Sequence, residues 1–329
     1  MKKLLGIFGL LLVVCVATHL MSPQFLTPYN IENLFRRTAL FGILSIGVAF
    51  VIITSGIDLS IGSVVCLVGV GLPWLLTEIK VPLGAALGIA IGVSVAIGFV
   101  HGWLITRLRI QPFVVTLCGL LIYRGIARGI TRDQTMGFGN DFKGLRWLAT
   151  EKIAIPGLDN FAIPFPCIIL LVVAILAAIL LNQTIYGRYL LALGRNEDAA
   201  KYSGIRTERM IILAYVICAT LSGLGGLLFV LDVNSAQPAD FGNFYELYAI
   251  AAAVLGGCSL RGGQGTIIGV ILGTALMQVL RTMITLVDAL PKNIEFAIIG
   301  TVILGGVIAD EVVKRYLAKR KAARQLSAG

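Results

Sequence analysis

Long apolar segments separated by short polar ones recur along most of the chain. A window of membrane length finds ten of them, near residues 4–21, 38–55, 61–78, 82–101, 110–127, 161–181, 210–231, 246–260, 266–284 and 294–313. An α-helix needs about 20 predominantly apolar residues to cross the hydrocarbon core of a bilayer. The pattern therefore predicts an all-α integral membrane protein, a polytopic bundle of about ten transmembrane helices that forms one domain over residues 1–329.

Composition supports this prediction. Of the 329 residues, 57% are apolar and 13% are charged, whereas soluble domains carry about 25% charged residues. The net charge of +10 also fits a nucleic-acid-binding protein. The basic residues, however, concentrate in connecting segments and the tail, where anionic lipid headgroups lie. We expect these residues to contact membrane lipid and no nucleic acid.

The first apolar segment, 4–21, follows a charged start as a secretion signal does. No clean small-residue cleavage site follows it and nine further apolar segments do, which favours a retained signal-anchor helix. The six cysteines stand singly inside apolar runs without metal-ligand spacing, so they are expected to be packing residues.

Three polar segments stand out: a loop at 186–209, a segment at 128–160 and a basic tail at 314–329. Ten crossings place both termini on one side, and the excess of Lys and Arg assigns that side, with the loop and tail, to the cytoplasm. The 128–160 segment is then external. It is either a cap that meets a soluble partner or a plain linker.

Glycines recur every fourth residue in two apolar segments, at Gly84, Gly88 and Gly92 and at Gly269 and Gly273. Small residues at this spacing let helix backbones approach closely in lipid. They predict tight packing within the bundle.

The string GIDLSIGS, from Gly56 to Ser63, places an aspartate and two serines where two apolar segments meet. Polar backbone at membrane depth is tolerated only where protein buries it or water lines it. Two interpretations stay open: a broken helix beside a substrate path, or a tight cytoplasmic turn in which Asp58 caps a helix.

Sequence signatures of enzymes are missing. A glycine-rich stretch from Leu255 to Thr266 lacks the GxxxxGK[ST] pattern of a phosphate-binding loop, and the sequence contains no HExxH, GxSxG or histidine cluster. We interpret this stretch as a glycine turn with Arg261 facing the cytoplasm. No catalytic residue, metal site or cofactor is predicted in this chain.

The polar loop at 186–209 contains the signals of a two-turn helix. Asn196 suits an N-cap, Glu197 and Asp198 fall in the first turn, Lys201 falls near the last, and Gly204 suits a left-handed C-terminal cap. A helix this short is unstable alone in water. It must therefore be held by packing, and Ala199 and Ala200 are expected on its exposed side, where a partner surface would meet it. The alternative is that the loop is only a solvated connector between two spans.

Four motifs resemble one family of permeases. They are GIDLSIGS, the loop ALGRNEDAAKYSGI, the string AAAVLGGCSLRGGQGT and the span HGWLITRLRIQPFVVTLCGLLIYRG. Together they look like the permease subunits of bacterial ABC importers for ribose, xylose, arabinose, galactosides and autoinducer-2, over about residues 30–312. The chain departs from the family pattern at His101, where asparagine is usual.

The resemblance implies a mechanism and partners. A separate cytoplasmic ATPase would bind ATP and magnesium, a periplasmic binding protein would deliver a sugar, and a second permease copy or homologue would complete the path in the inner membrane. The polar loop would be the coupling helix seated in the ATPase, with its role falling on Gly194, Arg195, Asn196, Glu197, Asp198, Ala199, Ala200 and Gly204.

Polar residues in or beside the spans are the candidates for the translocation path: Asp58, Ser60, Ser63, Gln111, Asn234, Gln237 and Glu246. Neutral sugars need hydrogen-bond donors and acceptors rather than a counter-ion. Two alternatives remain open. One is an ABC permease for branched-chain amino acids, and the other is a proton-coupled transporter that would use Asp58, Glu246 or Glu295 as a relay.

Overall fold

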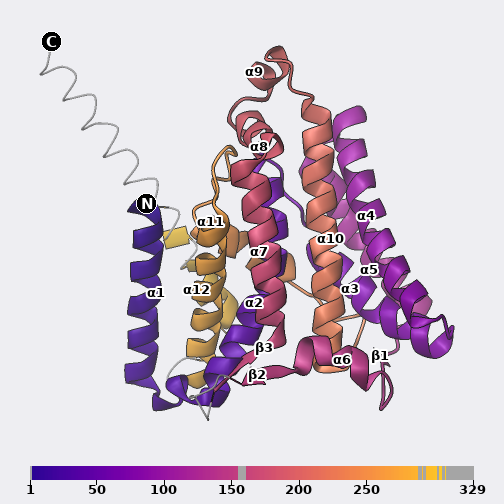
Figure 1. Cartoon of the computed structure of the whole chain (residues 1–329), viewed down its shortest axis with the longest axis vertical. Helices are drawn as coiled ribbons and strands as arrows, with labels where there is room; N and C mark the ends of the chain where they lie inside the picture. The colour runs from indigo at the N-terminus through magenta and orange to yellow at the C-terminus, as the bar shows by residue number, and fades with distance from the viewer. Residues whose placement is uncertain are drawn as a thin grey trace, which may run out of the picture.

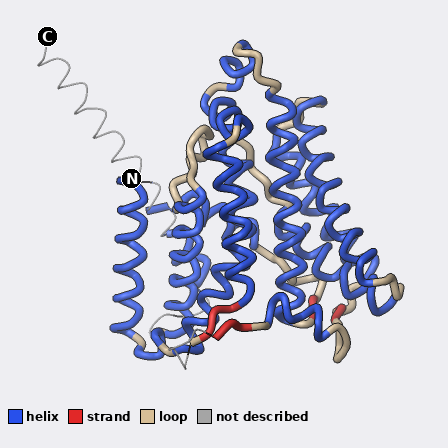
Figure 2. The backbone as a smooth tube through the Cα atoms, viewed as in Figure 1, coloured by secondary structure: helices blue, strands red, loops and turns tan. Residues whose placement is uncertain are grey.

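The structure, a computed structural model, describes residues 2–154, 161–287, 291, 294–301, 304–305 and 308. Long helices pack side by side (Figure 1), and the few short strands lie at one end of the bundle (Figure 2). In chain order the elements are α1 (Lys2–Met21), η1 (Pro23–Leu26), α2 (Pro28–Ile53), α3 (Ile61–Pro73), η2 (Trp74–Glu78), α4 (Leu83–Arg107), α5 (Pro112–Thr131), β1 (Met136–Gly137), α6 (Lys143–Thr150), β2 (Lys152–Ala154), β3 (Ala162–Pro164), α7 (Phe165–Gln183), α8 (Ile185–Arg195), α9 (Glu197–Tyr202), α10 (Thr207–Val233), β4 (Ser235–Ala236), α11 (Tyr245–Leu255) and α12 (Ile267–Leu286).

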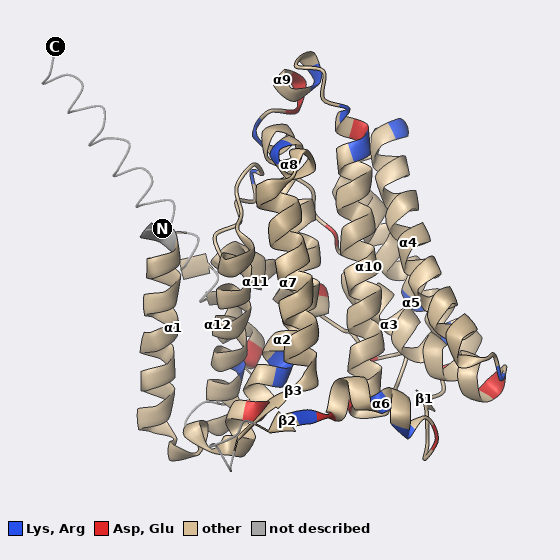
Figure 3. Ribbon diagram, in the orientation of Figure 1, with Lys and Arg blue, Asp and Glu red and all other residues tan. Residues whose placement is uncertain are grey.

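The predicted all-α polytopic fold is confirmed. Within the described residues, eight helical segments are long and apolar enough to cross a membrane. The segment predicted at 246–260 is the shorter apolar helix α11. The last predicted segment, 294–313, lies partly outside the described residues, and the predicted tail at 314–329 lies wholly outside them. Most positions of Lys, Arg, Asp and Glu lie toward the two ends of the bundle, and a few lie between them (Figure 3).

Prolines mark where several spans begin. Pro28 and Pro112 are the first residues of α2 and α5, and Pro166 is the second residue of α7. Proline suits a helix start because its missing N–H would be unpaired there anyway and its fixed φ is already helical. Proline at the first or second position therefore helps to fix where each of these spans begins.

Helices α2 and α10 form the centre of the bundle. Residues 39–53 of α2 are all buried. Three glycines of α10 touch three different neighbours: Gly223 lies against Ser94 of α4, Gly225 against Leu44 of α2 and Gly226 against the backbone of Val65 in α3. Close approach of this kind gives the van der Waals contact that holds helices together in lipid.

Only one of the two predicted rows of glycines packs closely against a neighbouring helix. Gly269 contacts the carbonyl of Gly256 and Gly273 contacts the carbonyl of Ala252, which confirms tight packing between α12 and α11. At Gly84, Gly88 and Gly92 an added Cβ would meet nothing within 4 Å. The prediction of close packing there is wrong within this chain, because this stripe of α4 points away from the described bundle.

The 128–160 segment is folded onto the end of the bundle, as far as the structure describes it. Helix α6 packs beside α10 and α7, and Arg146 donates a 3.1 Å hydrogen bond to the Leu231 carbonyl. Antiparallel β1–β4 and β2–β3 pairs and a Lys152–Glu32 ion pair add further attachments. The described part is therefore packed structure and not a linker.

Candidate functional site

The polar loop folds as two short helices at one end of the bundle (Figure 1). Thr184 precedes α8, and its hydroxyl oxygen accepts a 3.3 Å hydrogen bond from the Gly187 N–H. Asn196 then separates α8 from α9, and its Oδ1 accepts a 2.9 Å bond from the Ala199 N–H. Both side chains satisfy N–H groups that a helix start leaves unpaired. The predicted N-cap at Asn196 is confirmed.

The C-terminal end of α9 is equally well defined. Gly204 has a φ of +82°, in the left-handed region. The Gly204 N–H donates to the Lys201 carbonyl at 3.0 Å and the Ile205 N–H donates to the Ala200 carbonyl at 3.1 Å. This pair of bonds is a Schellman motif, which closes a helix. Both ends of α9 are thus fixed by local contacts, as the sequence predicts.

The faces of α9 differ from the sequence-based expectation at one residue. Ala199 is exposed as predicted, but Ala200 is buried against the core of the protein. The expectation of exposure is wrong for Ala200 because it is the third residue from the helix end, where the Schellman turn directs it inward toward Ile205. Ala200 therefore holds α9 to its own bundle rather than presenting a surface.

Tyr202 is the side chain that the sequence reasoning missed. It is 93% exposed at the end of α9. Exposed aromatic side chains surrounded by polar residues are typical anchors of protein interfaces. The available signal was an aromatic residue inside an otherwise polar loop. Glu197, Asp198 and Arg195 are exposed around it.

Gly194 differs from the exposed residues of α9 because it lies inside the bundle. It is buried at the end of α8, where an added Cβ would collide with the Ile53 carbonyl and the Gly263 N–H. It presents no surface, and its position is one of backbone contact with the end of α2.

The segment between α2 and α3 is a buried break. Asp58 is 1% exposed, and its Oδ1 accepts bonds from the Ser60 N–H at 2.8 Å and the Ser60 hydroxyl at 2.6 Å. Ser60, not Asp58, is the N-cap residue of α3. The interpretation in which Asp58 caps a helix is therefore wrong, and the burial of this polar segment favours the other interpretation, that of an irregular segment inside the bundle.

Neighbouring helices hold the break in place. The Ile57 carbonyl accepts hydrogen bonds from the Tyr215 hydroxyl at 3.2 Å and from the Thr116 hydroxyl at 3.3 Å. His101, 1% exposed, shares a 2.8 Å hydrogen bond between its Nε2 and the Tyr123 hydroxyl. Its Nδ1 is buried without a partner among the described residues. Polar groups from α4, α5 and α10 thus surround the break.

Some of the predicted path residues come together. Ser63, in the first turn of α3, donates a 2.7 Å hydrogen bond to the Leu120 carbonyl, midway along α5. The Glu246 carboxylate and the Gly242 carbonyl lie against Gly62 beside it. Asp58, Ser60, Ser63 and Glu246 are therefore grouped near the start of α3.

The other three path residues lie elsewhere. Gln111 is exposed at the start of α5, and Gln237 is exposed in the loop after β4. Asn234 ends α10 and donates from its amide to the Gly139 carbonyl at 3.1 Å. The structure does not bring these three to the break.

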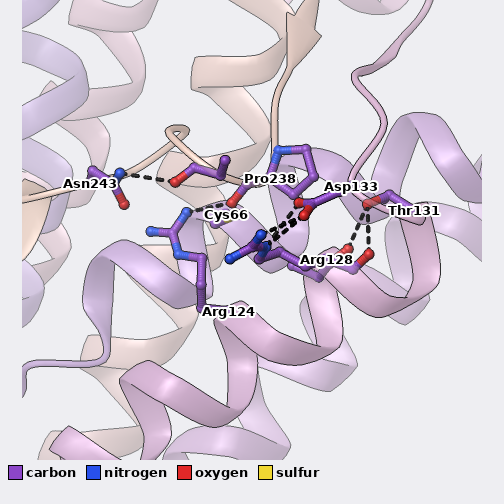
Figure 4. A network of polar contacts seen from close by, with 9 residues as sticks. Cys66, Arg124, Arg128, Thr131, Asp133, Pro238 and Asn243 are labelled. Atoms are coloured by element: carbon purple, nitrogen blue, oxygen red, sulfur yellow. Dashed lines mark hydrogen bonds and ion pairs between the residues drawn. The ribbon is translucent and has the colours of Figure 1, made fainter.

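Arg124 is a second residue that the sequence reasoning did not assign to the site. It lies on α5 and donates to the Pro238 carbonyl at 3.0 Å and the Phe241 carbonyl at 2.6 Å (Figure 4). A cation within a span is expensive in lipid and marks protein or water around it. Arg124 therefore fixes the 237–244 loop, which leads to Glu246, against α5.

The end of α5 carries a surface ion pair. Arg128 donates from Nε and from a terminal guanidinium nitrogen to the two oxygens of the Asp133 carboxylate, and this hydrogen bonding holds the pKa of Asp133 below its usual value (Figure 4). The pair closes the turn that follows α5. It belongs to the 128–160 segment and not to the break.

Known proteins are similar to this chain over most of its length. A family profile described as "Branched-chain amino acid transport system / permease component" matches residues 30–308. The ribose import permease of Escherichia coli (strain K12) is 35% identical over 302 residues, which are 91% of this chain and 91% of that protein. The D-allose permease of the same strain is 29% identical, covering 94% and 92%. The xylose permease of Haemophilus influenzae is 29% identical, covering 88% and 91%. No solved structure matches the chain significantly.

Proposed function

Because this chain belongs to the family of permease components whose profile covers residues 30–308, a family of multi-pass inner-membrane proteins, we propose that it is the membrane subunit of an ATP-driven importer for a monosaccharide. In this proposal a separate ATPase binds ATP and magnesium in the cytoplasm. A periplasmic binding protein delivers the sugar, and a second permease copy or homologue completes the path.

The capped helix α9 is the observation that supports the ATPase partner most directly. Its ends are fixed by Asn196 and by the Schellman motif at Gly204, and it presents Tyr202 with 93% of its surface exposed. A six-residue helix is far below the roughly 12 residues that make an isolated helix marginally stable. Caps at both ends keep this projecting element in one shape, which suits a piece that seats in a partner.

Charge supports the cytoplasmic assignment of the α9 end. Basic residues in the elements and turns that meet at this end are Arg107, Arg109, Arg188, Arg195, Lys201, Arg206, Arg209 and Arg261. Short loops rich in Lys and Arg stay on the cytoplasmic side of a membrane. Helix α1 begins toward the same end (Figure 1), which would place the N-terminus in the cytoplasm as well.

The named relatives favour a sugar as the cargo. They are permeases for ribose, D-allose and xylose, and the ribose permease is 35% identical to this chain. The hydroxyls of Ser60 and Ser63 are buried and bond Asp58 and the Leu120 carbonyl, so the relatives carry the assignment of the cargo. We therefore assign the cargo to pentoses or hexoses.

The proton relay is poorly supported by the geometry. Glu295, one of its three carboxylates, accepts a 2.8 Å bond from the Arg281 guanidinium and a 3.3 Å bond from the Tyr248 hydroxyl. Its described partners are thus a guanidinium and a phenol, and neither of the other two relay carboxylates is among them.

Uptake into proteoliposomes tests the proposal. The complex of this chain, its ATPase and its binding protein is reconstituted and supplied with labelled ribose, xylose, allose or leucine. We expect uptake of at least one sugar that needs ATP and stops with vanadate. Uptake of leucine alone would show that the chain is a permease for branched-chain amino acids. Uptake driven by a pH gradient without ATP would contradict the proposal.

A further inference from the structure

Three backbone segments from distant parts of the chain meet at the α9 end of the bundle. They are the end of α2, the end of α8 and the glycine turn at 256–266. The Gly263 N–H donates a 2.9 Å hydrogen bond to the Ile53 carbonyl. Gly194 lies between these two groups, so closely that a Cβ would collide with both. The three segments are therefore in direct backbone contact.

Ser55 stands at the centre of this junction in an unusual conformation. The Ser55 N–H bonds the Ile52 carbonyl at 2.9 Å and the Gly56 N–H bonds the Val51 carbonyl at 3.0 Å, which makes a Schellman end for α2. Ser55 occupies the left-handed position of that motif, with a φ of 65°. Glycine is the usual residue there because a Cβ is strained in this region.

The hydroxyl of Ser55 gives a reason for a serine at this position. Its Oγ lies 3.2 Å from the Gly194 carbonyl and 3.0 Å from the Arg261 carbonyl, and it is the donor to both. A glycine would relieve the strain but would lose both contacts. A serine hydroxyl carries a single hydrogen, so the two carbonyls share it or exchange it. A small shift of α8 relative to the glycine turn is enough to move the bond from one to the other.

The residues after Ser55 lead directly into the buried break. Gly56 is packed against the Tyr215 hydroxyl, and the Ile57 carbonyl accepts bonds from Tyr215 and Thr116. Asp58 follows, 1% exposed. An extended segment of three residues thus joins a junction at the surface to the polar groups inside the bundle.

We propose that Ser55 is a positioning residue that passes movement of α8 and α9 both to the buried 56–60 segment and to the glycine turn. The inference rests on the proposed function, because it assumes that an ATPase moves α9. It also gives a role to the glycine turn, whose left-handed Gly262 and Gly263 pack against Ser55 and Arg195.

The variant that tests this inference most directly is Ser55→Gly, which removes the hydroxyl and relieves the strain of the left-handed backbone at this position. The assay uses the reconstituted complex and whichever of ribose, xylose and allose the wild type transports. We expect ATP hydrolysis to continue while the amount of sugar taken up per ATP hydrolysed falls. The loss should be roughly fivefold, the factor that one neutral hydrogen bond contributes. Lys80→Gly is the matched control, because Lys80 has a φ of 60° in a turn outside the junction.

An unchanged ratio of uptake to hydrolysis in Ser55→Gly would overturn the inference and leave the proposed function intact. A wild-type complex without any ATP-driven uptake would instead defeat both. Hydrogen exchange on the wild-type complex gives a second test that needs no variant. Trapping with ATP and vanadate should alter exchange in peptides 54–60 and 256–266 together with 185–204, and a change confined to 185–204 would also overturn the inference.

Discussion

Gly194 shows how much the junction at the end of α8 depends on the absence of a side chain. A Cβ there would meet the Ile53 carbonyl and the Gly263 N–H, and backbone cannot move aside as the end of a flexible side chain does. Gly194→Ala should therefore lower the unfolding free energy by about 1–3 kcal/mol, as overpacked cores do.

Thermal unfolding in detergent measures this effect. Gly88→Ala is the control, since its Cβ would meet nothing within 4 Å and alanine is favoured over glycine in a helix by about 1 kcal/mol. If the two variants unfold at the same temperature, the close contact at Gly194 is not present in solution.

Asp58 is the single side chain on which the break depends most. It accepts two hydrogen bonds from Ser60, at 2.8 Å and 2.6 Å. Asp58→Ala leaves two buried donors unpaired, which costs about 1–3 kcal/mol each, so we expect transport to be strongly impaired.

Asp58→Asn distinguishes a sugar path from a proton relay. The amide keeps an oxygen that accepts both bonds but cannot take part in proton transfer. Uptake assays on both variants should show that asparagine retains most of the activity that alanine loses. Equal loss in the two variants would contradict the hydrogen-bonding role given to Asp58.

At the scale of elements, α9 is held in shape by its ends. Gly204 has a φ of +82° and open space around the position of a Cβ. Gly204→Leu therefore creates backbone strain of about 1–2 kcal/mol without a clash at the Cβ. We expect the bundle to remain folded, the end of α9 to change, and ATP hydrolysis to continue with little sugar uptake.

The control for this prediction is Gly139→Leu. Gly139 has a φ of +59° and equally open space, but it lies in the external segment. Normal coupling in Gly204→Leu, measured as sugar transported per ATP hydrolysed, would show that the assignment of α9 as the coupling element is wrong.

Local signals explain which elements were predictable. Asn196 and Gly204 act on groups a few residues away, so the sequence alone predicts α9. The segment around Asp58 is held by Tyr215 and Thr116, which bond the Ile57 carbonyl from far along the chain, so local signals left two interpretations open. No local signal predicts the left-handed conformation of Ser55, because the residue that normally indicates this conformation in a sequence is glycine.

The same limit applies to faces of helices. The four-residue spacing of Gly84, Gly88 and Gly92 equals that of Gly269 and Gly273, yet only the second pair contacts a neighbouring helix. Spacing predicts which residues share a face, but not which faces the bundle buries. The β1–β4 pair was likewise unpredictable, since Met136 and its partner Ala236 are far apart in the sequence.

At the scale of the whole molecule, the account orients the bundle in the membrane. In the proposed orientation the α9 end would face the cytoplasm, and α6 with its neighbouring strands, which lie at the opposite end of the bundle (Figure 3), would face the periplasm. The test uses a variant in which all six native cysteines are replaced. A single cysteine is then introduced in place of Tyr202 or of Lys143, both of which are exposed. In intact cells with a permeable outer membrane, an impermeant maleimide should label position 143 and spare position 202. The reverse pattern would invert the topology.

The central claim is that α9 seats in a separate ATPase. The most direct measurement places a photo-crosslinking amino acid at Tyr202, and for comparison at Lys143, and irradiates the intact complex in membranes. The account predicts a crosslinked product with the ATPase subunit from position 202 and none from position 143. Failure of position 202 to reach the ATPase, in a complex that transports sugar, would contradict it.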